Sequence, residues 1–148
     1  MFARHHPSVL AYAARRVGRT EAGDVAAETF TVAWRRLSRV PHEPATLPWL
    51  YGVARNVVRN HLRSRRRAER LVMRQAGEAG AAATADPEIL EALDRLSSDD
   101  REILMLAAWE GLASSEIAAV LGCSPNTAAV RLHRARRRLE AVMEGDSP

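Results

Sequence analysis

The stretch EIAAVLGCSPNTAAVRLHRARRRL, residues 116–139, decides the fold of the C-terminal part of this chain. A short apolar segment stops at Gly122, and glycine commonly stands just past the last turn of a helix. Ser124 and Pro125 then favour the N-cap and the first position of a new helix. Two helices joined by a tight, glycine-containing turn are the elements of a helix-turn-helix, whose second helix enters the major groove of DNA.

The spacing of apolar residues supports this interpretation. Ile117, Val120 and Leu121 are predicted to pack onto an apolar stripe of the second helix, formed by Ala128, Leu132, Ala135 and Leu139. Five arginines and a histidine are then left to solvent or to phosphate: Arg131, His133, Arg134, Arg136, Arg137 and Arg138. Any one of them could be an ordinary solvated charge, but the cluster coincides with the cap, the turn and the apolar register. The sequence therefore predicts a DNA-facing helix.

Helical patterns also fill the segment upstream of this motif. Residues 87–96 are amphipathic, and residues 97–111 begin with Ser97 three residues before Asp100, an arrangement resembling a capping box. No strand pattern interrupts them. An all-α fold is predicted, with a C-terminal domain at 87–148.

The N-terminal part predicts three more helices, at about 7–17, 21–37 and 48–67. The second places Phe30, Ala33, Trp34 and Leu37 at i, i+3, i+4 and i+7, which predicts a buried face. Three prolines in VPHEPATLP, residues 40–48, exclude a helix through that segment.

The third N-terminal helix carries a basic stripe. Its predicted inner face comprises Leu50, Tyr51, Ala54, Val57, Val58, His61 and Leu62. Its outer face repeats Arg55, Arg59, Arg63 and Arg67 every four residues, beside Asn56 and Asn60. Like charges at this spacing repel one another. Since no glutamate occurs between Glu43 and Glu69, the stripe indicates an anionic partner.

An Ala- and Gly-rich segment, residues 76–86, predicts a flexible linker between an N-terminal domain at 1–75 and the C-terminal domain. A continued alanine-rich helix is the alternative. The chain has 148 residues, enough for two small domains. Residues 1–75 contain 15 arginines but only 5 acidic residues, so this half is strongly basic. All 22 basic residues are arginine, the cation that suits phosphate and guanine edges.

Several classes of site are not indicated by the sequence. Cys123 is the single cysteine, so no internal disulfide is expected. His133 has no second metal ligand at helical spacing. No catalytic motif, metal-ligand spacing or cofactor-binding motif is present. The chain is predicted not to be an enzyme. No apolar run is long enough for a membrane span or a signal peptide, so a cytoplasmic location is expected.

Two segments of the chain resemble regions 2 and 4 of the bacterial extracytoplasmic-function sigma factors. They are LPWLYGVARNVVRNHLRSRRR (47–67) and LSSDDREILMLAAWEGLASSEIAAVLGCSPNTAAVRLHRARRRL (96–139). The resemblance implies an initiation factor that binds core RNA polymerase and promoter DNA and promotes strand opening. It implies polymerase contacts for Asp24, Glu28, Trp34 and Arg35. A place in the domain core is the alternative for Phe30 and Trp34, and it is the preferred interpretation for Phe30. An anti-sigma factor is a further potential partner.

The resemblance also implies two DNA surfaces. The loop at 40–48 corresponds to the element that captures a base flipped out of the minus-ten region, and the minus-ten contacts would be Trp49, Arg55, Asn56, Arg59, Asn60 and Arg63. The minus-35 contacts would be Ser124, Asn126, Thr127, Ala129, Val130, Arg131, His133, Arg134 and Arg137. Ala129 departs from a basic residue usual in the family, so apolar contact with a thymine methyl is expected there or at Val130.

Two further departures concern helix ends. Ala113 stands where the family commonly has a capping serine, so Ser114 is predicted to take that role. The family normally has one or two more helical turns before the first helix, so either this helix is short or the assigned start is late. A shortened helix would expose part of Phe30 and Trp34.

Two other functions remain open from the sequence alone. A self-sufficient helix-turn-helix regulator would dimerise on a palindrome, but it leaves the basic N-terminal half unexplained. An interaction protein would use the arginine helix to bind an acidic partner. The promoter sequence and the inducing signal are not determined by the sequence.

Overall fold

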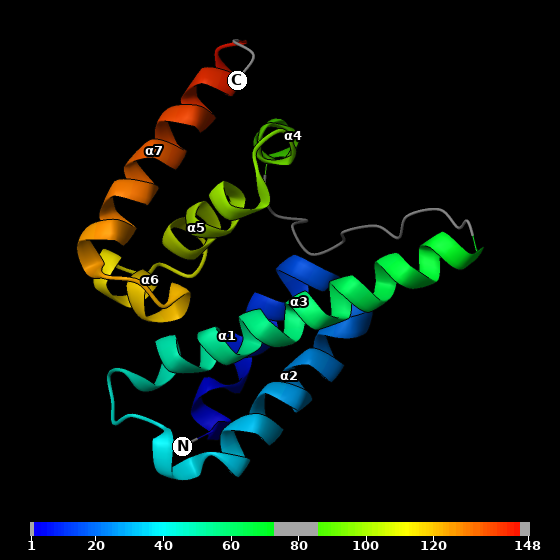
Figure 1. The fold of residues 1–148 in the computed structure, drawn as a ribbon, viewed down its shortest axis with the longest axis vertical. Helices are drawn as coiled ribbons and strands as arrows, with labels where there is room; N and C mark the ends of the chain where they lie inside the picture. The colour runs from blue at the N-terminus through cyan, green and yellow to red at the C-terminus, as the bar shows by residue number, and fades with distance from the viewer. Residues whose placement is uncertain (1, 73–85, 146–148) are drawn as a thin grey trace. The chain divides into compact units, whose positions relative to one another are not determined.

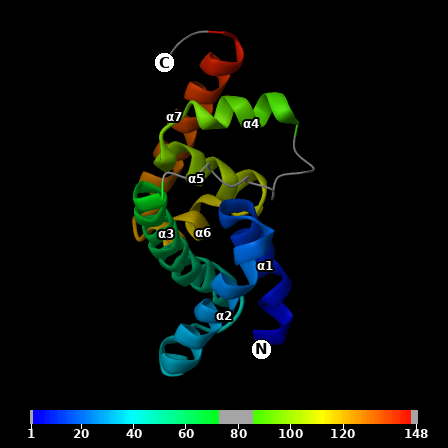
Figure 2. The same ribbon diagram turned by 90° about the vertical axis from the view of Figure 1, so that its right-hand side faces the viewer.

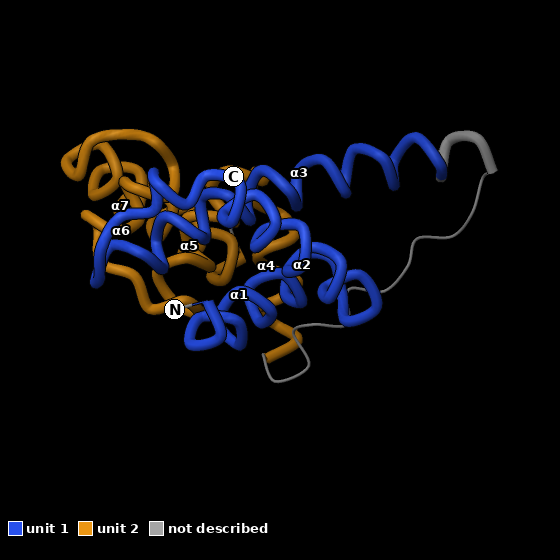
Figure 3. Tube along the Cα trace, turned by 90° about the horizontal axis from the view of Figure 1, so that it is seen from below, with its two compact units in different colours: residues 1–83 blue, residues 84–148 orange. Residues whose placement is uncertain are grey.

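The computed structural model describes residues 2–72 and 86–145, with the side chains of 69–72 left aside, and it divides the chain into two compact units at 1–83 and 84–148 (Figure 3). The first unit contains α1 (Phe2–Val17), α2 (Arg19–Arg35), the short 3₁₀ helix η1 (Leu37–Arg39) and α3 (Thr46–Val72). The second contains α4 (Pro87–Asp94), α5 (Ser98–Ala108), α6 (Ser114–Leu121) and α7 (Pro125–Met143) (Figures 1 and 2). The predicted all-α fold is confirmed. The predicted linker lies outside the described residues except for Asp86.

The first unit is built from three helices that pack against one another. Gly18, at φ 88°, lets the chain reverse between α1 and α2, so that α2 returns alongside α1 (Figure 1). Tyr12 of α1 is fully buried and its ring stacks on that of Tyr51 of α3, with centroids 5.2 Å apart. Leu50 is also fully buried. These contacts fix α3 on the α1–α2 pair and direct the opposite face of α3 outward.

The buried face of α2 differs from the predicted one. Small and β-branched residues face the core: Ala22, Val25, Ala26, Thr29 and Ala33. Trp34 and Leu37 are 68% and 45% exposed, and Phe30 is half-buried rather than fully within the core. Helical spacing alone favoured the large apolar residues. The small side chains instead let α2 lie close to α1 and α3, and α2 ends at Arg35 instead of Leu37.

The helix boundaries of the second unit follow local chemistry. Ser97 and Ser124 each accept a hydrogen bond from a backbone N–H of the helix that they begin, and Gly122 ends α6 in the left-handed conformation at φ 74°. One prediction is wrong: Ala113, not Ser114, is the N-cap of α6. Glu116 accepts a hydrogen bond from the backbone N–H of Ala113 at 2.9 Å. This is the half of a capping box that needs no polar side chain at the N-cap, so alanine can stand there.

The core of the second unit joins α6 to α7, and α7 also contacts α4 and α5. Ile117, Ala128 and Ala135 are fully buried, and Leu132 is 6% exposed. Leu106 of α5 is fully buried too. Leu121 and Leu139, which were predicted to complete this contact, are only half-buried. The apolar register therefore holds α7 with one face inward along most of its length.

Candidate nucleic-acid interface

The N-terminus of α7 is fixed by two hydrogen bonds between its cap residues. The Ser124 hydroxyl accepts from the backbone N–H of Thr127 at 3.1 Å and donates to the Thr127 hydroxyl at 2.9 Å. Thr127 is half-buried, whereas the other candidate minus-35 residues are exposed: Ser124, Asn126, Ala129, Val130, Arg131, His133, Arg134 and Arg137. The helix thus presents a polar, cationic face whose start is rigidly set.

Arg138 lies on the same helix but has a different environment. Its Nη1 donates to both carboxylate oxygens of Asp100, at 2.9 Å each, and the Asp100 side chain is only 14% exposed. The expectation that Arg138 is left to solvent or phosphate is wrong, because this ion pair joins α7 to the first turn of α5. Ion pairing of this kind between distant residues could not be read from helical periodicity.

The outer face of α3 carries the second candidate surface. Asn56, Arg59, Asn60, Arg63 and Arg67 are exposed, while Trp49 and Arg55 are half-buried. Arg63 donates to the amide oxygen of Asn60 at 3.3 Å, so two of the candidate minus-ten residues already contact each other. The stripe predicted from the sequence therefore faces outward, and only its N-terminal member, Arg55, is half-buried.

The segment between η1 and α3 is held by several hydrogen bonds. The fully buried Thr46 hydroxyl donates to the carbonyl of Pro41 at 2.8 Å, and Ala45 N–H donates to the carbonyl of His42 at 2.9 Å. The Glu43–Pro44 peptide bond is cis. The two hydrogen bonds define a folded loop, residues 40–45, placed directly before α3.

Glu43 connects this loop to α1. His5 Nε2 lies 2.6 Å from Glu43 Oε2, and Arg4 lies 3.9 Å from the same oxygen. The hydrogen bond from His5 holds the pKa of the Glu43 carboxyl below its ordinary value. No sequence motif pointed to His5, because its partner is 38 residues away.

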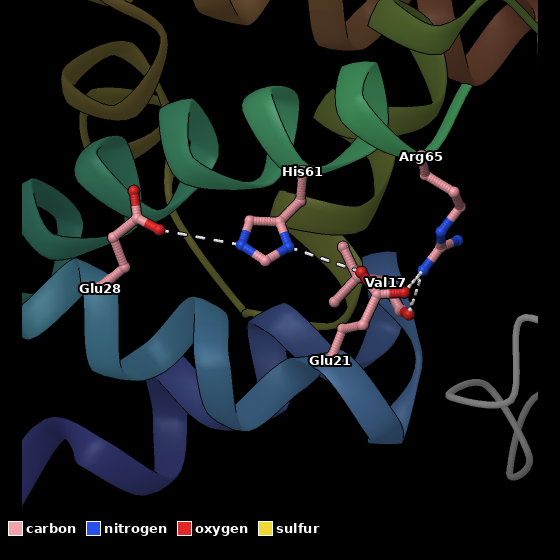
Figure 4. A network of polar contacts seen from close by, with 5 residues as sticks. All are labelled: Val17, Glu21, Glu28, His61 and Arg65. Atoms are coloured by element: carbon pink, nitrogen blue, oxygen red, sulfur yellow. Dashed lines mark hydrogen bonds and ion pairs between the residues drawn. The ribbon is translucent and has the colours of Figure 1, made fainter. Parts of the chain in front are cut away.

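A second network joins α2 to α3 (Figure 4). The His61 ring lies between Glu21, at 3.5 Å, and Glu28, at 3.8 Å, and Arg65 donates to Glu21 and to the carbonyl of Val17. Burial acts to raise the pKa of Glu21, but hydrogen bonds from Arg65 and His61 outweigh it, so the pKa lies below its ordinary value. Arg65 is therefore a structural cation, distinct from the exposed stripe.

The candidate polymerase contacts are all on the surface of α2. Asp24, Glu28, Trp34 and Arg35 are exposed. Phe2, in the first turn of α1, lies against Phe30 and Trp34, with ring centroids 5.3 and 6.5 Å apart. The aromatic side chains of α2 thus form a cluster with Phe2 of α1, in which Phe2 and Phe30 are half-buried and Trp34 is exposed.

Within residues 2–72 and 86–145, no group of three His, Cys, Asp or Glu side chains is arranged to hold a metal ion. The same residues contain no helix with the length and apolarity needed to cross a membrane.

Comparisons with known proteins agree with the two-unit organisation. The family model "Sigma-70 region 2" matches residues 1–68, and "Sigma-70, region 4" matches residues 87–139. RNA polymerase sigma factor CarQ of Myxococcus xanthus is 35% identical, over 97% of this chain and 87% of CarQ. ECF RNA polymerase sigma factor EcfG of Rhodopseudomonas palustris is 31% identical, over 95% of this chain and 81% of EcfG. The chain spans only 36% of the length of a further relative, the probable sigma factor RfaY of Xanthomonas campestris.

Solved structures show the same likeness. The structure of CnrH in complex with the cytosolic domain of CnrY matches with a TM-score of 0.69 and 32% identity, covering 98% of this chain and 86% of that one. The sequence of CnrH from Cupriavidus metallidurans is 31% identical over 96% of this chain. RpoE of Bartonella quintana, solved with NepR, matches with a TM-score of 0.71 at 24% identity, which supports the fold.

Proposed function

This chain belongs to the extracytoplasmic-function family of RNA polymerase sigma factors, and we propose that its two units divide promoter recognition between them. Sigma factors are transcription initiation factors, and we assign this chain no catalytic residue and no cofactor. We propose residues 1–75 as the region 2 domain, 76–86 as a linker and 87–148 as the region 4 domain.

We assign the minus-35 element to α7. The observation that carries this assignment is the capped helix itself, whose apolar face is buried while Arg131, Arg134 and Arg137 are exposed together. Arginine is well suited to phosphates and to the edges of guanine. Asn126, Ala129 and Val130 lie on the exposed side and are proposed to set base preference.

We assign the minus-ten element to the outer face of α3 and to the loop at 40–45. The exposed arginines of α3 would bind the phosphates of the separated strand, and Asn56 and Asn60 would contact bases. The loop lies directly before α3 and is held by the buried Thr46, so it can offer a preformed conformation to an extruded base.

We propose core RNA polymerase as the partner of α2, through Asp24, Glu28, Trp34 and Arg35. Trp34 is 68% exposed, and a large exposed aromatic side chain is a common anchor of protein interfaces. These partners imply a cytoplasmic location. CnrH is solved with the cytosolic domain of CnrY, and RpoE of Bartonella quintana is solved with the anti-sigma factor NepR. By analogy, we propose that an anti-sigma factor also binds this chain.

Run-off transcription with purified core polymerase on a genomic promoter library tests the assignment. The chain is expected to direct initiation at a defined set of promoters, and Arg134→Ala to lower their transcription. Arg95→Ala, which removes an exposed arginine elsewhere in the same unit, is the matched control and is expected to act like wild type. Initiation at no promoter in the library would refute the proposal.

The same experiment separates the alternatives. A self-sufficient regulator would bind duplex DNA without core polymerase and would not co-purify with it. An interaction protein would neither bind duplex DNA on its own nor direct transcription with core polymerase. A pull-down from the native cytoplasm that returned polymerase but no other protein would count against the proposed anti-sigma partner.

A further inference from the structure

The hydrogen bond between α1 and the loop at 40–45 links two parts of the first unit that no sequence motif connects. His5 is 8% exposed, on the same face of α1 as the fully buried Val9 and Tyr12. It could be a core histidine with no further role. Its partner argues otherwise, because Glu43 belongs to the loop and its side chain is 40% exposed.

The chemistry of the pair gives the bond a direction. A carboxylate can only accept hydrogen bonds, so the Nε2–H of His5 donates to Glu43 Oε2 over 2.6 Å. Hydrogen bonds to an ionised group are roughly twice as strong as neutral ones. The buried imidazole cannot move far without displacing core side chains, so it fixes the position of the carboxylate.

The loop is thereby held from two sides. Thr46 anchors it at the start of α3 through the carbonyl of Pro41, and His5 anchors it to α1 through Glu43. Between these anchors, the exposed residues His42, Pro44 and Ala45 face solvent. Removing the His5 anchor leaves the loop attached through Thr46 and through the longer, exposed contact of Glu43 with Arg4.

We infer that His5 is a positioning residue for minus-ten recognition, acting through Glu43 to hold the loop at 40–45 in the conformation that receives the extruded base. This inference rests on the proposed role of the loop in base capture. His5 itself lies behind the loop and needs no contact with DNA. Its effect is on base preference at the minus-ten element and not on the minus-35 element, which is assigned to the other unit.

The test uses holoenzyme, assembled from the full chain and core polymerase, and promoters recovered from the library above with the minus-ten positions randomised. Transcripts are sequenced to give the base preference at each position. His5→Ala is expected to reduce the preference at the captured position about tenfold, the size expected when a hydrogen bond to a charged group is lost. Preference at a randomised minus-35 element is expected to be unchanged.

Three further variants distinguish positioning from a general effect on folding. His5→Gln, whose amide can donate near the position of Nε2, is expected to restore most of the preference. Glu43→Ala removes an exposed carboxylate without disturbing the core and is expected to match His5→Ala. Arg4→Ala is the matched control, because Arg4 faces the same oxygen from 3.9 Å with a side chain that is 72% exposed, and it is expected to leave the preference unchanged.

The outcomes separate the inference from the proposed function. If the wild-type chain directs no promoter-specific transcription, the proposed function fails. If the wild type is active and both His5→Ala and Glu43→Ala keep its minus-ten preference, only the inference is overturned. Should His5→Ala fail to fold by circular dichroism, Glu43→Ala decides. A combined variant that loses no more preference than either single change would show that the two residues act through one contact.

Discussion

Arg134 and Arg138 lie one helical turn apart on α7, and we predict that their removal has different consequences. Arg134 is exposed on the proposed DNA face, whereas Arg138 donates to both oxygens of Asp100 at 2.9 Å. The two variants Arg134→Ala and Arg138→Ala remove the same charge from the same helix. Any difference between them therefore reports what each guanidinium contacts.

The expected sizes follow from these environments. Each phosphate contact contributes about 0.9 to the slope of log Kobs against log salt, so Arg134→Ala should lower that slope by about 0.9. Between 50 and 200 mM salt, the affinity of Arg134→Ala should therefore fall by a factor roughly 3.5-fold smaller than that of the wild type. Arg138 is neutralised by Asp100, so its removal should leave the slope unchanged. It should instead destabilise the second unit by about 1 kcal/mol, the upper end for a largely exposed ion pair, because the geometry is good and Asp100 is partly buried.

Fluorescence anisotropy of the holoenzyme, assembled from the full chain and core polymerase, on a promoter duplex carrying the selected minus-35 element measures the slope. Urea denaturation of the chain alone measures stability. The double variant Arg138→Ala with Asp100→Asn is the control for the unpaired carboxylate left by the single change, and it should keep the wild-type slope. A slope for Arg138→Ala that falls by as much as that for Arg134→Ala would show that Arg138 leaves Asp100 to bind phosphate. That result would refute the structural assignment of the ion pair.

Three other perturbations test separate parts of the structure. Trp34→Ala should leave the melting temperature nearly unchanged, since the side chain is 68% exposed, and weaken core polymerase binding about tenfold in a titration with labelled polymerase. Glu21 has a lowered pKa in the folded state, so its carboxylate stabilises the first unit above the ordinary carboxyl pKa of about 4.3, and this contribution is lost as the pH falls through the folded-state value. Glu21→Gln should therefore make the free energy of unfolding less dependent on pH below about 5, and an unchanged dependence in urea titrations would contradict the network with Arg65. Gly122→Ala should cost about 1 kcal/mol, measured by thermal denaturation, because the left-handed conformation at φ 74° disfavours a Cβ although no neighbour lies within 4 Å of it.

The parts of the fold that the sequence predicted well are those with local causes. Ser124, Pro125 and Gly122 act within a few residues of their own position, and the structure places the end of α6 and the start of α7 where these residues indicate. The N-cap of α6 was predicted one residue too late, at Ser114, because the preference for serine at N-caps takes no account of Glu116. The backbone N–H needed a partner, and the side chain three residues on supplied it.

Contacts between distant residues account for what the sequence did not predict. The inner face of α2 was predicted from large apolar residues, yet Ala26 and Thr29 are buried and Trp34 is exposed. Close helix packing favours small residues at the contact, but the sequence alone does not show which helices approach closely. The candidate DNA and polymerase residues remain predictions, since their exposure is compatible with a binding role and is not evidence of binding.

The two basic helices share one structural feature that bears on how they would bind DNA. On each, one arginine is paired with a carboxylate of a neighbouring helix: Arg65 of α3 with Glu21 of α2, and Arg138 of α7 with Asp100 of α5. Such a bond resists rotation of the helix about its own axis, because the guanidinium can meet its partner from one side only. The helix that carries the remaining arginines is then held in one orientation. The charge proposed to bind DNA is consequently smaller than the number of arginines on the two helices suggests, because Arg65 and Arg138 are paired with carboxylates.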